Sequence, residues 1–182
     1  MIDAYFIHLL ILIGIYSILA ISLQLSLGYS GLLNLGHIAF FGIGAYASAI
    51  LALNGFPFLI YLVAAGIISA FFGWLLSIPT NKLKGDYLAL VTLGFSFVVY
   101  AVLLNWTTLT KGSLGLPGIP RPIIAGIDFS ENTFFLILVF IIAFASYLFI
   151  NRICKSSFGK ALEATRDDEL AAKSLGKNTT KI

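Results

Sequence analysis

The chain has 182 residues, of which 59% are apolar and only 10% are charged, and its mean hydropathy is +1.00. Soluble domains carry about 25% charged residues, so the charges here are too few to cover the outside of a soluble domain of this size. The composition therefore excludes a soluble domain and indicates an integral membrane protein. The single cysteine, Cys154, excludes an internal disulfide and a multi-cysteine metal site.

Long apolar runs predict the membrane-spanning helices, because a bilayer core of about 30 Å requires about 20 helical residues. The five runs lie at residues 4–27, 32–53, 58–78, 87–105 and 133–150. The last three contain no formal charge, so no charged helix face is available to meet water. We predict an all-α, polytopic membrane protein with about five transmembrane helices in residues 1–150 and a cytosolic segment in residues 151–182.

The placement of the charges predicts the orientation of these helices. Residues 151–182 hold seven basic and four acidic side chains, so the whole net charge of +3 lies in this segment. A basic segment beside a membrane is a topology signal and does not indicate a nucleic-acid partner. We predict that residues 151–182 are cytoplasmic and, counting back through five crossings, that the N-terminus is outside.

The cytosolic segment changes character and predicts an amphipathic helix from about Ser157 to Leu175, with Gly176 as its stop. Two interpretations of this helix remain open from composition alone. It lies on the membrane surface, or it docks a partner protein.

The most informative stretch runs from Gly28 to His37, where three glycines and the polar side chains of Asn34 and His37 interrupt the apolar pattern. Broken helix at membrane depth is tolerated only where protein or a water-filled cavity satisfies the backbone, and polar residues in a span often mark a transport path. A packed helix junction, with Asn34 and His37 bonded to a neighbouring helix, is the structural alternative. Residues 42–47 spell G-x-G-x-x-A, but inside an apolar helix this pattern indicates close helix packing more than nucleotide binding.

No motif predicts covalent chemistry. The sequence contains no P-loop, catalytic triad or cluster of metal-ligating side chains. We therefore expect no enzyme activity, no cofactor and no metal site in this chain.

Four blocks of sequence resemble one transporter family. They are residues 28–46, 84–95, 109–120 and 158–176. In order and spacing they resemble the M-type inner-membrane permease subunit of ABC importers for branched-chain amino acids. Subunits of that family are longer, so we expect this chain to be an N-terminal fragment or a truncated reading frame.

The resemblance implies a permease subunit in a prokaryotic inner (plasma) membrane. It works with ABC ATPase subunits, a second permease subunit, a periplasmic or extracellular substrate-binding protein and membrane lipid, and with no nucleic acid. The block at 158–176 corresponds to the cytoplasmic segment that couples to the ATPase. The residues implied for this contact are Glu163, Arg166, Asp167, Asp168, Glu169, Ala171, Ala172 and Gly176.

Import of branched-chain amino acids, or of related urea and amide compounds, is thus the leading interpretation. An amino acid needs polar anchors for its charged ends within an apolar wall. The polar side chains expected on or near the path are Gln24, Asn34, His37 and Thr92. Two alternatives remain: an ion- or proton-coupled secondary transporter that uses His37, and a membrane assembly protein without a transport role.

Overall fold

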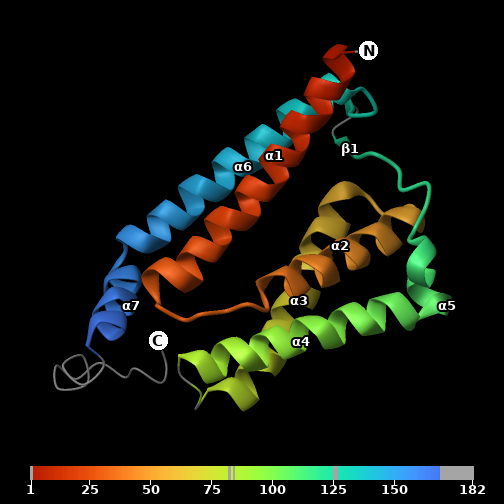
Figure 1. The fold of residues 1–182 in the computed structure, drawn as a ribbon. Coiled ribbons are helices and arrows are strands. Elements are labelled where there is room, and N and C mark those ends of the chain that lie inside the picture. Colours follow the sequence, from red (N-terminus) through yellow and green to blue (C-terminus); the bar gives the residue numbers. More distant parts are fainter. Residues whose placement is uncertain (1, 82, 84, 125–126, 169–182) are drawn as a thin grey trace. The chain divides into compact units, whose positions relative to one another are not determined.

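The computed structural model describes residues 2–81, 83, 85–124 and 127–168, and the chain divides into two compact units. The first unit combines Met1–Leu33 with Glu131–Ile182, and the second unit is Asn34–Ser130. Figure 1 shows the elements of both units in chain order.

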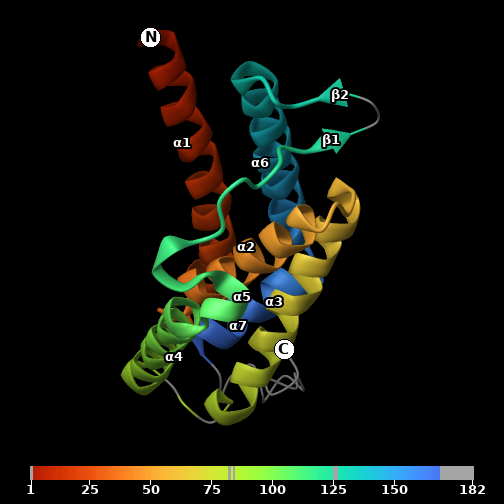
Figure 2. The same cartoon turned by 90° about the vertical axis from the view of Figure 1, so that its right-hand side faces the viewer.

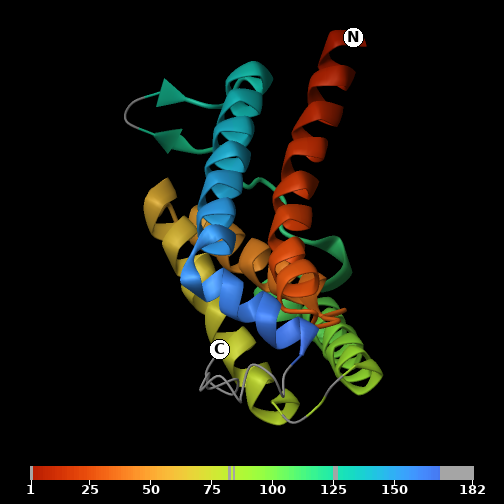
Figure 3. The same cartoon turned by 90° about the vertical axis from the view of Figure 1, so that its left-hand side faces the viewer.

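The first unit is a pair of long helices with a short helix at one end. Its elements are α1 (Ile2–Gln24), the π-helix η1 (Leu25–Tyr29), α6 (Asn132–Lys155) and α7 (Ser157–Asp167). α1 and α6 lie side by side and run in the same direction (Figures 1 and 3). They approach closely at Gly14, where a Cβ would lie 2.5 Å from Cγ1 of Val139. Helices in lipid associate through such small residues, since packing must replace the hydrophobic effect.

We expect Gly14→Ala to lower the free energy of unfolding by about 1–2 kcal/mol, because the added methyl group overlaps the Val139 side chain. Titration of the purified chain with denaturing detergent, followed by circular dichroism, measures the change. Combining Gly14→Ala with Val139→Ala removes the obstructing methyl groups and should restore part of the loss. A single variant as stable as the parent would contradict this account of the α1–α6 contact.

The second unit is built on α2 (His37–Leu53), α3 (Phe58–Thr80) and α4 (Asp86–Asn105). α2 and α3 form a hairpin, and α2 also contacts α4 (Figure 2). Gly44 faces α3, where a Cβ would lie 2.9 Å from Oγ of Ser69, and that hydroxyl donates to the Phe40 carbonyl at 3.1 Å. The close helix packing expected for residues 42–47 is therefore found at Gly44.

A loop with little regular structure completes the second unit. It contains α5 (Thr107–Thr110), the 3-10 turn η2 (Gly112–Leu114) and a two-stranded antiparallel hairpin, β1 (Ile123–Ile124) with β2 (Ile127–Asp128). Thr110 is fully buried, and its hydroxyl oxygen lies 2.6 and 2.8 Å from the carbonyl oxygens of Leu103 and Trp106, which ties the loop to the end of α4. After the hairpin, hydrogen bonds from the hydroxyl and the amide of Ser130 lower the pKa of Asp128.

The predicted class, an all-α polytopic membrane protein, is confirmed for the described residues, apart from the short hairpin. Four helices are long and apolar enough to cross a membrane, and α2, at 17 residues, is a shorter apolar helix. The four are Ala4–Tyr29, Phe58–Thr80, Asp86–Asn105 and Asn132–Lys155.

Three helix boundaries differ from the sequence predictions by five residues or more. The helix expected to end at residue 150 continues to Lys155, so α6 extends into the segment predicted to be cytosolic. The run expected to begin at residue 32 is helical only from His37, because the backbone leaves the helix at Gly31, where φ is +66°. The single helix expected to reach Leu175 ends at Asp167, and Asp168 is extended with φ −154°. The predicted stop at Gly176 lies outside the described residues.

Candidate functional site

The helical conformation is interrupted between η1 and α2, at residues 30–36, and α4 holds the second half of this break. The amide of Leu35 donates to Oγ1 of Thr92 at 3.1 Å, and the carbonyl of Leu35 accepts from Oγ of Ser96 at 3.2 Å. Thr92 is only 3% exposed, and its hydroxyl lies 2.9 Å from the carbonyl of Leu88, one turn earlier in α4. Two α4 side chains thus satisfy both backbone groups of one residue in the break, as broken helix in an apolar environment requires.

Asn34 and Thr92 are brought together around Gly36. The side-chain oxygen of Asn34 accepts from the amide of Gly36 at 2.9 Å. A Cβ at Gly36 would lie 3.0 Å from the Thr92 carbonyl oxygen and 3.1 Å from Oδ1 of Asn34. His37 follows directly as the first residue of α2 and is half-buried. Asn34 and Thr92 therefore stabilise the shape of the break through their oxygen atoms.

Ser96 is a residue of this junction that the sequence analysis did not identify. It lies four residues after Thr92, so the two hydroxyls share one face of an otherwise apolar helix. That spacing of two hydroxyls was the available signal. Gln24, also proposed for the path, belongs to the first unit, where it is the last residue of α1 and its exposed side chain lies against Gly28.

The corner between α6 and α7 is tightly built. Ser156 has an extended backbone between the helices, its hydroxyl donates to the Ile153 carbonyl at 2.6 Å, and it accepts from the Gly159 amide at 3.4 Å. This is the N-cap arrangement expected for serine. Gly159 is buried, and a Cβ there would lie 2.6 Å from the carbonyl carbon of Cys154. Any residue with a Cβ would overlap the Cys154 backbone, so only glycine fits at position 159.

The residues implied for the ATPase contact separate into distinct environments on α7. Glu163 is half-buried, and Arg166 is partly exposed, with its guanidinium directed at the carbonyl of Gly28. Asp167 and Asp168 are exposed. Four further residues of this set, Glu169, Ala171, Ala172 and Gly176, lie outside the described residues. Lys160, Ala164 and Asp167 follow helical spacing and form an exposed face, defined here as the outer face of α7.

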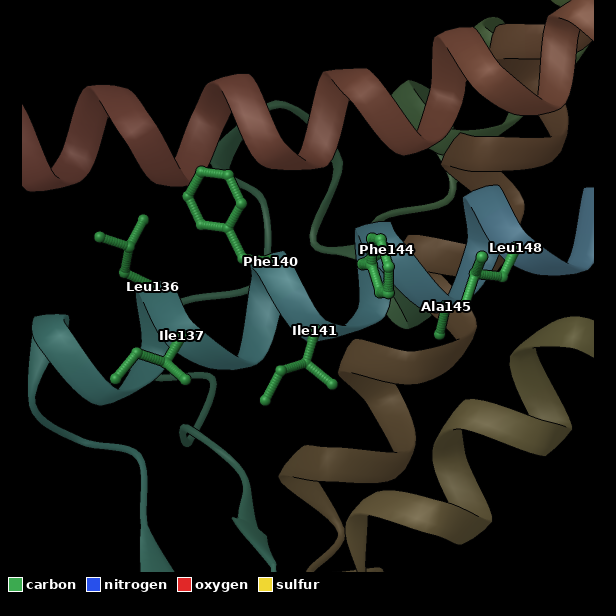
Figure 4. A pocket seen from close by; sticks show the side chains of 7 residues that line it. All are labelled: Leu136, Ile137, Phe140, Ile141, Phe144, Ala145 and Leu148. Carbon is green, nitrogen blue, oxygen red and sulfur yellow. The ribbon is translucent and has the colours of Figure 1, made fainter.

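An apolar groove of about 540 Å³ runs along α6. Figure 4 shows Leu136 and Phe140 on one side of the helix and Ile137 and Ile141 on the other. Every residue that lines the groove is apolar, so it offers no anchor for the charged ends of an amino acid. Its chemistry fits lipid or another helix. Within residues 2–81, 83, 85–124 and 127–168, no three His, Cys, Asp or Glu side chains gather as metal ligands.

Comparison with known proteins gives a consistent result. The family model described as "Branched-chain amino acid transport system / permease component" matches residues 5–182. The high-affinity branched-chain amino acid transport system permease proteins LivM of Salmonella typhimurium and Escherichia coli are 41% and 39% identical, each over 92% of this chain. The probable branched-chain amino acid transport permease protein LivM of Methanocaldococcus jannaschii is 29% identical over 96% of this chain.

The chain spans about half the length of these relatives. The match covers 45% of the two bacterial proteins and 60% of the archaeal one. No solved structure matches the chain.

Proposed function

Because the chain belongs to the family of permease components of branched-chain amino acid transport systems, we propose that it forms part of the membrane path of an ABC importer for these amino acids or for related urea and amide compounds. The observation that carries this proposal is the family match over residues 5–182, which includes both the helix break and α7.

In this proposal the chain performs no covalent chemistry. Partner ABC ATPases hydrolyse ATP, a second permease subunit completes the path, and a periplasmic or extracellular binding protein delivers the substrate. Closure of the ATPases moves the cytosolic segment, and the spans alternate between outward and inward access. The absence of charged side chains from residues 87–105 and 133–150 disfavours an ion-coupled mechanism, which needs a coupled charge in the span.

We place residues 1–150 in the inner membrane, with the N-terminus outside and residues 151–182 in the cytoplasm as the coupling segment. The parallel direction of α1 and α6 supports this topology, because the first and fifth of five crossings run the same way. The basic residues Arg152 and Lys155 in the last turn of α6 support a cytoplasmic end there.

The helix break is the proposed position of the substrate path, with Gln24, Asn34, His37 and Thr92 as its polar residues. The contacts of Asn34 and Thr92 with the backbone support a role in holding the shape of the break. His37 and Gln24 are proposed to lie on or near the path. For the ATPase we propose the outer face of α7, continued by the segment that contains Ala171, Ala172 and Gly176.

Reconstitution of the complete assembly in liposomes tests this function. We expect leucine uptake that requires the binding protein and ATP, and no uptake when the ATPases carry an inactivating substitution in the ATP site. Uptake driven by a proton gradient without the ATPases would favour a secondary transporter instead. The assembly role would be favoured if the reconstituted assembly takes up no substrate and removal of this chain only destabilises another membrane protein.

We expect His37→Leu to reduce leucine uptake about tenfold, the loss that corresponds to one hydrogen bond of about 1.4 kcal/mol to the substrate. The structural cost should be small, because side-chain hydrogen bonds in membranes average about 0.6 kcal/mol. Initial uptake rates of the reconstituted assembly measure the effect. The control is Ser48→Ala, which removes only a bond to the Ala45 carbonyl within α2. Parental uptake by His37→Leu would remove His37 from the path.

A further inference from the structure

The C-terminal end of the first membrane helix is closed by a side chain from 138 residues further along the chain. Nη1 of Arg166 donates a hydrogen bond to the carbonyl oxygen of Gly28 in η1. In a continued α-helix, the amide of Leu32 would reach that carbonyl, but it donates to the Ser26 carbonyl at 3.2 Å instead. The last carbonyls of a helix lack partners and carry the negative end of its dipole, so a guanidinium is well suited to cap them.

The same arginine lies directly on the turn that follows η1. Gly31 has a φ of +66°, and a Cβ at Gly31 would lie 2.5 Å from Cγ and 3.2 Å from Cδ of Arg166. Glycine is required here by the left-handed backbone and by the close approach of the Arg166 side chain. α7 and the turn after η1 are therefore in direct contact, with no room for another side chain between them.

Asp167 orients this contact. Its Oδ1 accepts from Nε of Arg166 at 2.9 Å and lies 2.8 Å from Nη2. A carboxylate that engages two nitrogens of the guanidinium fork fixes its plane, which leaves Nη1 directed toward Gly28. The arginine thus turns inward, toward the end of α1, even though it is partly exposed.

α7 is held at both of its ends. Gly159 packs against the Cys154 backbone at one end, and Arg166 bonds to Gly28 at the other. The helix has 11 residues and so is about 16 Å long. Figure 3 shows it running from the end of α6 to the end of α1. A short helix held at two points transmits a displacement from one contact to the other.

We infer that Arg166 is a positioning residue that transmits movement of α7 to η1 and to the start of the helix break at Ser30 and Gly31, and that it does not contact the ATPase itself. The inference rests on the proposed function, in which the ATPase docks on α7. It assigns separate roles to neighbouring residues: Lys160 and Ala164 face the partner, and Arg166 faces the end of α1.

The test compares Arg166→Ala, Arg166→Lys and the parent in the complete reconstituted assembly. Three quantities are measured: co-purification of the ATPase, leucine taken up per ATP hydrolysed, and hydrogen exchange of the amides from Ser30 to Leu32. The control is Arg152→Ala, which removes an exposed arginine of α6 from the same unit.

For Arg166→Ala we expect the ATPase to remain bound, uptake per ATP to fall about tenfold, and exchange at Ser30–Leu32 to accelerate about tenfold. Lysine keeps a cation that reaches the carbonyl, so Arg166→Lys should recover part of both losses. Arg152→Ala should match the parent in all three quantities.

Loss of the ATPase from the Arg166→Ala assembly, with uptake per bound ATPase unchanged, would show that Arg166 is a docking contact and would overturn the inference. Parental uptake per ATP and parental exchange would overturn it as well. In both cases the unmodified assembly still imports leucine, so the proposed function stands. Failure of the unmodified assembly to show ATP-dependent uptake would instead overturn the proposed function and the inference together.

Discussion

Replacing Gly159 by alanine is expected to lower the free energy of unfolding by about 3 kcal/mol or more, the upper range for overpacking a buried position. The new methyl group would lie 2.6 Å from the carbonyl carbon of Cys154, which is backbone and cannot rotate away. This overlap can be relieved only if the corner between α6 and α7 opens. The Ser156 cap and the α7 contact with η1 would then be lost together. Detergent-titration unfolding and ATPase co-purification measure the two consequences.

A matched control is Gly66→Ala in α3, where an added Cβ meets no atom within 4 Å. Alanine is favoured over glycine inside a helix by about 0.5–1 kcal/mol, so this variant should be as stable as the parent or slightly more stable. If Gly159→Ala is as stable as Gly66→Ala and retains the ATPase, the backbones of Gly159 and Cys154 do not approach as closely as described.

Thr92→Val is expected to lower the free energy of unfolding by about 1–3 kcal/mol, the cost of leaving the part-buried amide of Leu35 without its partner. Valine has nearly the shape of threonine but cannot accept the hydrogen bond from the Leu35 amide. The carbonyl of Leu35 keeps its bond from Ser96, so the break should loosen on one side without unfolding. Hydrogen exchange of the Leu35 amide should accelerate, and uptake by the assembly should fall.

Thr92→Ser removes the methyl group but keeps the hydroxyl, so it distinguishes the effect of the hydrogen bond from the effect of packing. Serine retains the oxygen that accepts from Leu35, so exchange at this amide should stay near the parental rate. Equal exchange rates for Thr92→Val and the parent would mean that the Thr92 hydroxyl does not hold the break.

The amino-acid sequence by itself determined the class of the protein and most of its helices. Apolar runs such as residues 58–78 and 87–105 are long enough to cross a bilayer and carry no charge to meet water, so composition and length alone identify them. The three glycines between Gly28 and His37 likewise mark a break, because glycine and polar side chains weaken a helix wherever they occur. These are local properties of the chain, and each can be recognised without knowledge of its neighbours.

Only the tertiary structure decided where the break ends and what holds it. α2 begins at His37, because hydroxyls on α4, 57 and 61 residues away, bind Leu35 in a non-helical conformation. Likewise, Arg166 donates a hydrogen bond to the carbonyl of Gly28, which is 138 residues earlier in the chain. A polar side chain in a membrane helix can bind the substrate, a partner protein or a backbone group. The residue type is the same in all three cases, so the sequence alone does not distinguish them. The choice depends on which unsatisfied donor or acceptor lies within hydrogen-bonding distance, and only the packing of distant segments brings that group into place.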